Sequence, residues 1–338
     1  MARLKRSALI LFVILVIPAI VLGSFFYMSS LTNYSGKTES ITIGNAQSLE
    51  CDTLVHIAED QNFFVKNGLN VTIRDYPSGM AAVNDLLIGK VDVAATAEFP
   101  LVGKAFNGQN ISALATIAKT QLQDIIGRKD RGIENIAALA GKRVGVTLGT
   151  IAEFYFGRFL ELNGMKLGDV TIVNVSPSDS VGAITNGTVD AIIIWQPYAY
   201  TIENLLGDNA VIWPAQSSQL TYIVEVARNE WITQHPDLVN RFLTSLAQAQ
   251  DYFDNHPGES EAIIQKKLNY TDAYMASVWP KNVFSLSLDQ SLILAMEDEA
   301  RWMMSNNLTN ATEVPNFLNY VYVDGLETVK PNSVNVIR

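Results

Sequence analysis

The sequence has one cysteine, few histidines and a deficit of basic residues, and each shortage excludes a class of function. Cys51 is the only cysteine among the 338 residues, so neither an internal disulfide nor a C-x-x-C metal or redox motif can form. The three histidines, His56, His235 and His256, match no catalytic or metal-binding motif. A formal net charge of −10 argues against nucleic-acid binding, which needs a basic surface. We therefore expect no enzyme, metal ion or cofactor.

The charge is unevenly distributed along the chain. Residues 1–37 carry four basic residues and no acidic one, so residues 38–338 have a net charge of −14. An uncharged apolar run, Ala8–Met28, follows the basic N-terminus and matches the roughly 20 residues that a helix needs to cross a membrane. We expect residues 1–40 to form a membrane anchor and a linker, with a cytoplasmic N-terminus and the rest of the chain outside the cytoplasm.

A cleavable signal peptide is the alternative interpretation of this N-terminal segment. Its apolar core is usually only ~7–15 residues long and precedes small residues at the cleavage site, which residues 21–23 and 27–29 match poorly. Both interpretations export the remainder of the chain. The exported part contains eight N-x-S/T sequences, which an Asn- and Thr-rich surface explains as well as glycosylation does. They begin at Asn33, Asn70, Asn110, Asn174, Asn186, Asn269, Asn307 and Asn310.

Two stretches about a hundred residues apart repeat the same landmarks in the same order. Each has Asn-Gly at the end of a predicted helix, Pro-Ser at the start of another, and Gly-x-Val-Asp before a strand. The landmarks lie at residues 67–68, 77–78 and 89–92, and again at 163–164, 177–178 and 187–190. This repetition predicts two similar βαβαβ lobes in an α/β protein.

The predicted lobes place the candidate site between them. With 48% hydrophobic residues, the chain can form one large or two medium domains. We expect lobe 1 to comprise residues 41–125 and 222–338, lobe 2 to comprise residues 126–221, and two strands to act as hinges. Parallel strands bring their carboxyl ends and the following helix N-termini to one edge, so a small ligand is expected in the cleft between the two edges. Backbone N–H groups there can hold a polar or anionic group without Lys or Arg.

Three side chains at these edges have more than one interpretation. Glu98 and Glu153 could form a carboxylate pair across the cleft, as glycosidase chemistry requires, which would make the protein an enzyme. Glu153, in the first turn of a predicted helix, is explained more simply by the helix dipole. Trp195, at a predicted strand end, either stacks on a ligand or closes the core.

Four segments, taken in order, carry a resemblance to a known family: Phe63–Leu69, Gly89–Asp92, Leu139–Val146 and Val189–Pro197. The set resembles the nitrate/sulfonate/taurine-type substrate-binding proteins of ABC importers, a family that includes binders of thiamine-pyrimidine precursors, and the resemblance covers residues 41–338. It implies a type II periplasmic-binding-protein fold, in which two α/β lobes joined by two hinge strands close around one solute. The expected membrane anchor is a difference from this family, because many of its members have a lipid-modified cysteine or are free in the periplasm.

The resemblance also implies a site and partners. The partners are an ABC permease and its ATPase subunits, the binding domain is a monomer, and the solute is a small organic anion such as a sulfonate, taurine or nitrate. A thiamine-pyrimidine precursor or similar heterocycle is the alternative solute, and a sensing domain that acts through a partner is the alternative role. The related pyrimidine-synthesising enzymes carry an active-site histidine and a cysteine cluster. With a single cysteine, this sequence does not support that activity. The implied ligand contacts are Gln47, Ser48, Ser78, Gly79, Thr96, Glu98, Gly149, Thr150, Ile151 and Trp195.

Overall fold

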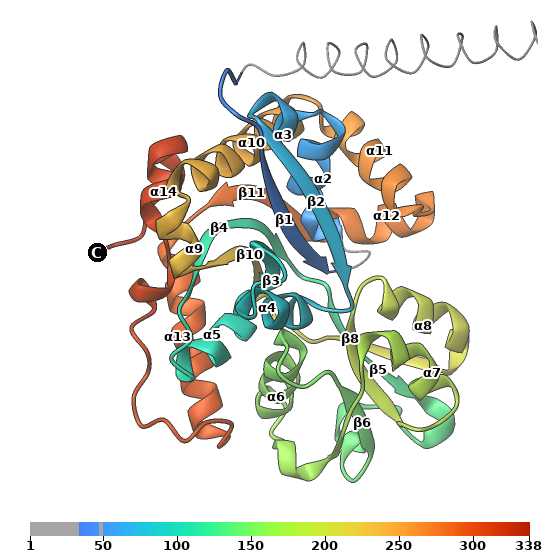
Figure 1. The fold of residues 1–338 in the computed structure, drawn as a ribbon. Coiled ribbons are helices and arrows are strands. Elements are labelled where there is room, and N and C mark those ends of the chain that lie inside the picture. Colours follow the sequence, from blue (N-terminus) through green and yellow to red (C-terminus); the bar gives the residue numbers. More distant parts are fainter. Residues whose placement is uncertain (1–33, 47–49) are drawn as a thin grey trace, which may run out of the picture.

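The computed structural model describes residues 34–46 and 50–338. The expected membrane segment, residues 8–28, lies outside these ranges, as do Gln47 and Ser48. Within the described ranges, no helix combines the length and the apolarity that crossing a membrane requires. The described chain forms two α/β lobes, each built on its own sheet (Figure 1).

The first sheet has six strands in the order β11-β4-β10-β3-β1-β2. β1 runs parallel to β2 and β3, whereas β10 runs antiparallel to β3 and β4, and β11 antiparallel to β4. β4 is buried along nearly its whole length, as expected of a central strand that is covered on both faces. The strands span β1 (Glu39–Ala46), β2 (Leu69–Tyr76), β3 (Val93–Ala97), β4 (Ile111–Thr120), β10 (Thr221–Arg228) and β11 (Asn282–Ser287).

Within the described ranges, ten α-helices belong to the lobe built on this sheet. The longest, α10, is amphipathic and buries a stripe that includes Leu238, Phe242 and Leu246 at spacings of four residues. The helices span α2 (Thr53–Asp60), α3 (Phe63–Lys66), α4 (Gly79–Leu87), α5 (Glu98–Phe106), α9 (Asn229–Gln234), α10 (Pro236–Asn255), α11 (Pro257–Leu268), α12 (Asp272–Val278), α13 (Gln290–Ser305) and α14 (Val323–Val329).

The second sheet has five strands in the order β7-β6-β8-β5-β9. β6 runs parallel to β7 and β8, while β5 runs antiparallel to β8 and β9. The elements of this lobe are β5 (Gln123–Arg128), β6 (Arg143–Val146), α6 (Ile151–Leu162), β7 (Thr171–Asn174), α7 (Ser180–Thr185), β8 (Ala191–Trp195), α8 (Tyr198–Leu206) and β9 (Ala210–Pro214).

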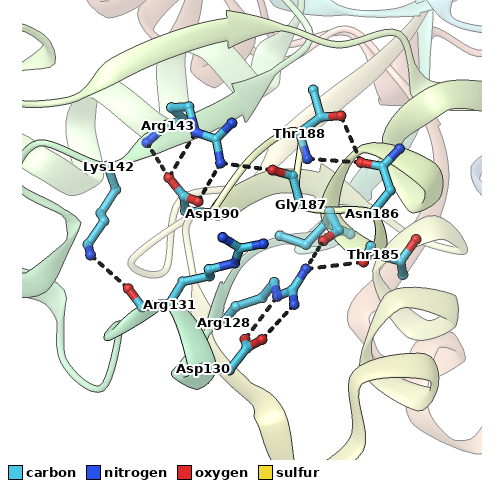
Figure 2. A network of polar contacts seen from close by, with 11 residues as sticks. Arg128, Asp130, Arg131, Lys142, Arg143, Thr185, Asn186, Gly187, Thr188 and Asp190 are labelled. Carbon is cyan, nitrogen blue, oxygen red and sulfur yellow. Dashed lines mark hydrogen bonds and ion pairs between the residues drawn. The ribbon is translucent and has the colours of Figure 1, made fainter.

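Equivalent residues of the repeat make equivalent contacts in the two lobes. Asn67 and Asn163 each donate from Nδ2 to the carbonyl oxygen four residues earlier, at 2.8 Å in both lobes. The Asp92 carboxylate accepts a hydrogen bond from the backbone N–H of Thr42 at 2.8 Å, and that of Asp190 accepts one from Arg143 N at 3.0 Å (Figure 2). These side chains stabilise helix ends and strand backbones and do not line the cavity between the lobes, so their shared role is structural.

The chain crosses between the sheets twice, from β4 to β5 and from β9 to β10. Gln216 joins the two crossings, because its Nε2 donates to Thr120 O at 2.9 Å and its Oε1 accepts from Gln123 N at 3.0 Å. The expected boundaries differ slightly from these positions. Residue 125 lies inside β5, and residue 221 is the first residue of β10. β4 and β5 belong to different sheets, and so do β9 and β10. The chain therefore passes between the lobes through short connections, where we expected two continuous hinge strands.

Candidate solute-binding site

A cavity lies where the carboxyl ends of parallel strands from the two sheets face each other. Its space, counted together with the solvent at its open mouth, is about 630 Å³. Both lobes and both crossings contribute to its wall. The lining residues are Ala46, Cys51, Asp52, Ser78, Gly79, Met80, Ala95, Thr96, Ala97, Pro100, Thr120, Leu122, Gln123, Thr150, Ile151, Trp195, Gln196, Thr221 and Ile223.

The N-terminus of α4 forms one side of the cavity. Ser78 is the N-cap residue, and its Oγ accepts a hydrogen bond from Ala81 N at 3.3 Å, so its own hydroxyl hydrogen remains available for another acceptor. Gly79 follows directly. A Cβ atom at Gly79 would lie 2.6 Å from Thr96 Oγ1 and 2.7 Å from Thr96 Cα. The missing side chain therefore allows α4 to begin against the end of β3.

The N-terminus of α6 forms the opposite side. Thr150 is the N-cap residue, and its hydroxyl donates to the carbonyl oxygen of Thr147 at 2.7 Å. Gly149 adopts φ +74°, which favours glycine, and does not line the cavity. A Cβ atom at Gly149 would lie 3.1 Å from Met80 Cε, so this turn approaches the first lobe. Two helix N-termini, one from each lobe, thus face the same space.

The two glutamates considered as a catalytic pair do not line the cavity. Glu98 is fully buried, and its Oε1 accepts a hydrogen bond from Tyr222 N at 3.1 Å. Burial raises the pKa of Glu98 to about 8, although the Tyr222 hydrogen bond acts in the opposite direction. The Glu153 carboxylate instead accepts from Gly149 N at 2.7 Å, within its own loop. The two carboxylates therefore stabilise different backbone segments, and the geometry gives no support to the glycosidase interpretation.

Trp195 ends β8 at the cavity wall, and Gln196 directly follows it. The Trp195 ring is 9% exposed and makes an edge contact with Tyr198, at 6.5 Å between centroids. The Gln196 amide is held from both ends, because Nε2 donates to Asp124 Oδ2 at 3.1 Å and Oε1 accepts from Tyr200 N at 3.0 Å. Trp195 thus both closes the core of the second lobe and presents part of its surface to the cavity.

Several polar lining residues were missed by the sequence analysis. Asp52 lies at the start of α2, and Thr120, Gln123 and Thr221 lie at the crossings. Among the described residues, Thr96 Oγ1 and Gln123 Oε1 are buried atoms without a hydrogen-bond partner. Buried polar atoms usually have a partner, so a bound solute or water is expected to supply one here. No group of three metal-ligating side chains occurs in residues 34–46 and 50–338.

Of the ten ligand contacts implied by the resemblance, six line the cavity: Ser78, Gly79, Thr96, Thr150, Ile151 and Trp195. Glu98 and Gly149 lie outside its wall. Glu98 immediately follows β3, and a position in the sequence does not reveal that its side chain turns toward Tyr222 and away from the cleft.

The chain is similar to known binding proteins. It matches the family described as NMT1/THI5 like over residues 53–260. A candidate binding protein of Brucella abortus (strain 2308) is 27% identical over 264 residues, which cover 75% of this chain and 79% of that protein. The taurine-binding periplasmic protein of Escherichia coli (strain K12) is 27% identical over 228 residues, which cover 66% of this chain and 69% of that protein.

Solved structures show the same architecture. The alkanesulfonate-binding protein SsuA of Xanthomonas axonopodis pv. citri, bound to MOPS, has a TM-score of 0.73 at 18% identity and covers 85% of this chain and 99% of its own. The periplasmic nitrate-binding protein NrtA of Synechocystis has a TM-score of 0.68 at 14% identity, with coverages of 88% and 90%. The predicted α/β periplasmic-binding-protein fold is therefore confirmed. Because the family match covers more than half of the sequence, the chain belongs to the NMT1/THI5-like family, whose relatives include the sulfonate- and taurine-binding proteins that its sequence resembles.

Proposed function

We propose that the protein is an extracytoplasmic solute-binding subunit that captures one small molecule between its lobes and delivers it to an ABC permease and its ATPase subunits. The cavity carries this proposal, because its wall is assembled from the carboxyl edges of both sheets. The names of its relatives support transport, since they include binding proteins for taurine and aliphatic sulfonates.

The proposed mechanism is a hinge equilibrium that the solute shifts. A solute that contacts α4 and α6 at once stabilises the closed arrangement of the lobes. The ratio of its affinities for the closed and the open arrangement sets the extent of closure. The two crossings at residues 121–122 and 215–220 are the segments whose backbone changes on opening. No covalent step is required of the chain.

Two solute classes remain candidates for this cavity. The names of the relatives and the two helix N-termini favour a small organic anion such as a sulfonate, taurine or nitrate. The apolar wall around Trp195 favours the second class, a heterocycle such as a thiamine-pyrimidine precursor.

The membrane anchor is part of the same proposal. Residues 8–28 would hold the binding lobes at the outer face of the cell membrane, with the basic N-terminus in the cytoplasm. Membrane fractionation tests this arrangement. The full chain should stay with the membranes after a carbonate wash, whereas a chain that begins at residue 38 should not. An exported protein whose N-terminal sequence begins after residue 28 would instead identify a cleaved signal peptide.

A thermal-shift screen followed by small-angle scattering tests solute capture. The full chain in detergent is screened against sulfonates, nitrate, taurine, organic ammonium compounds and pyrimidines. A solute that binds only the folded protein at a hundredfold excess over its Kd should stabilise it by about 2.7 kcal/mol. The same solute should reduce the radius of gyration. If no solute in the screen stabilises the chain, or if binding occurs without compaction, the proposed function is contradicted.

A further inference from the structure

The charge of the cavity wall is the feature that best distinguishes between solute classes. The described lining residues include no Lys, Arg or His, and Asp52 is their only carboxylate. The neighbouring residues 47–49, Gln-Ser-Leu, also carry no charge. Asp52 is 1% exposed and directly precedes α2. An anionic solute would therefore meet a carboxyl group in this cavity and no positive side chain among the described lining residues.

A second acid lies behind the cavity wall. Glu225 on β10 pairs with Ala95 on β3, and Ile223, two residues earlier, pairs with Ala97. Since Ala95, Ala97 and Ile223 line the cavity, strand alternation places Glu225 on the same face of the sheet. Glu225 is completely buried, and neither of its carboxyl oxygens has a hydrogen-bond partner among the described residues.

The two acids influence each other. Burial and the charge of Asp52 raise the pKa of Glu225 well above its ordinary value. A buried carboxyl group without a partner is costly, and a second acid beside it adds to that cost. A positively charged donor group beside Asp52 would offset both effects, because it would pair with Asp52 and reduce the unfavourable field at Glu225.

The rest of the wall defines the body of such a solute. Trp195, Ile151, Pro100 and Met80 offer apolar surface, and the hydroxyl and amide groups of the wall offer neutral hydrogen bonds. We infer that the cavity selects an organic cation, an ammonium, amidinium or guanidinium group on an apolar body, whose charged end lies against Asp52 in front of Glu225. This inference rests on the proposed function of solute capture, and it names an organic cation where the names of the relatives suggested an anion.

Matched probes on the full chain test the inference. Benzylammonium and phenylmethanesulfonate share one apolar body and differ in the sign of the charge, and butylammonium and butanesulfonate form a second such pair. Calorimetric titration should show tighter binding of the ammonium member in both pairs. Tighter binding of the sulfonates, or no binding of either ammonium compound, would overturn the inference.

Isosteric variants test where the charged end of the bound solute lies. Asp52→Asn keeps a good N-cap residue and should weaken benzylammonium binding by at least about tenfold, because it removes the charge partner in a desolvated site. Glu225→Gln should weaken it by a smaller factor. Asp60→Asn, at the exposed other end of α2, is the control and should leave the affinity unchanged. Unchanged affinity in Asp52→Asn would overturn the inference.

The outcomes separate the solute class from the proposed function. If phenylmethanesulfonate binds and compacts the protein while benzylammonium does not, the solute class is wrong and the proposed function stands. If no solute in the wider screen binds or compacts the chain, the proposed function itself fails. The probe pairs need only the wild-type protein, so an unstable Asp52→Asn variant does not prevent the test.

Discussion

Gly79→Ala is the substitution whose effect the structure defines most closely. A Cβ atom at this position would lie 2.7 Å from Thr96 Cα, a backbone atom that cannot rotate away, and 2.6 Å from Thr96 Oγ1. The start of α4 must then move away from the end of β3. Overpacking of this kind costs about 1–3 kcal/mol. Because Ser78 and Gly79 line the cavity, solute affinity should fall together with stability.

Gly103→Ala provides the matched control. Gly103 lies inside α5, and a Cβ atom there would meet no atom within 4 Å. Alanine in an open helical position should raise the free energy of unfolding by about 0.5–1 kcal/mol. Urea unfolding and calorimetric titration of both variants give the comparison. If Gly79→Ala is as stable as Gly103→Ala and binds solute as the wild type does, the close packing of α4 on β3 is not what positions the site.

Three further predictions concern the site and the interface between the lobes. Ser78→Ala and Thr150→Ala should each weaken solute binding several-fold, about 1 kcal/mol per lost hydrogen bond, and unchanged affinity for both in calorimetry would remove them from the site. In Gly157→Ala, the added Cβ would overlap the buried ring of Trp302, so α6 and α13 must separate. Urea unfolding should show a loss of about 1–3 kcal/mol, and wild-type stability would contradict this packing. Glu98→Gln should change the pH dependence of stability. The folded-state pKa of Glu98 is raised from 4.5 to about 8, so its contribution to the free energy of unfolding falls as pH rises between these values. The stability of the variant, measured from pH 5 to 8, should therefore fall less steeply than that of the wild type. Identical pH profiles would refute this assignment.

The repeated local features of the fold could be predicted from the sequence. Asn67 and Asn163 each end a helix through the same side-chain hydrogen bond, and the Asp at the end of each Gly-x-Val-Asp motif accepts a hydrogen bond from the backbone of a neighbouring strand. The Asn contacts recur because each lies within one helix end, and the Asp contacts recur because each lobe pairs the corresponding parallel strands, β1 with β3 and β6 with β8. The turns that follow parallel strands must also lie at one edge of a sheet, which is why six of the proposed contact residues line the cavity.

The remaining site residues depend on contacts between distant segments. Glu98 accepts a hydrogen bond from Tyr222, 124 residues later. Burial, and after it the charge of Glu98, raises the pKa of Glu299 in α13 well above its ordinary value. Asp52 reaches the cavity because it directly precedes α2, which begins at Thr53. Gln123 lines the cavity only because the chain changes sheets beside it.

Alkylation of Cys51 tests the central claim of solute capture most directly. Cys51 is the only thiol of the chain, lines the cavity and is 2% exposed, so an unlabelled wild-type protein already contains the probe. Iodoacetamide should modify Cys51 slowly when a solute from the screen is bound at saturation, and at least about tenfold faster without it, because bound solute favours the closed lobes and fills the cavity. Equal alkylation rates with and without a solute that calorimetry shows to be bound would place that solute elsewhere and contradict capture between the lobes.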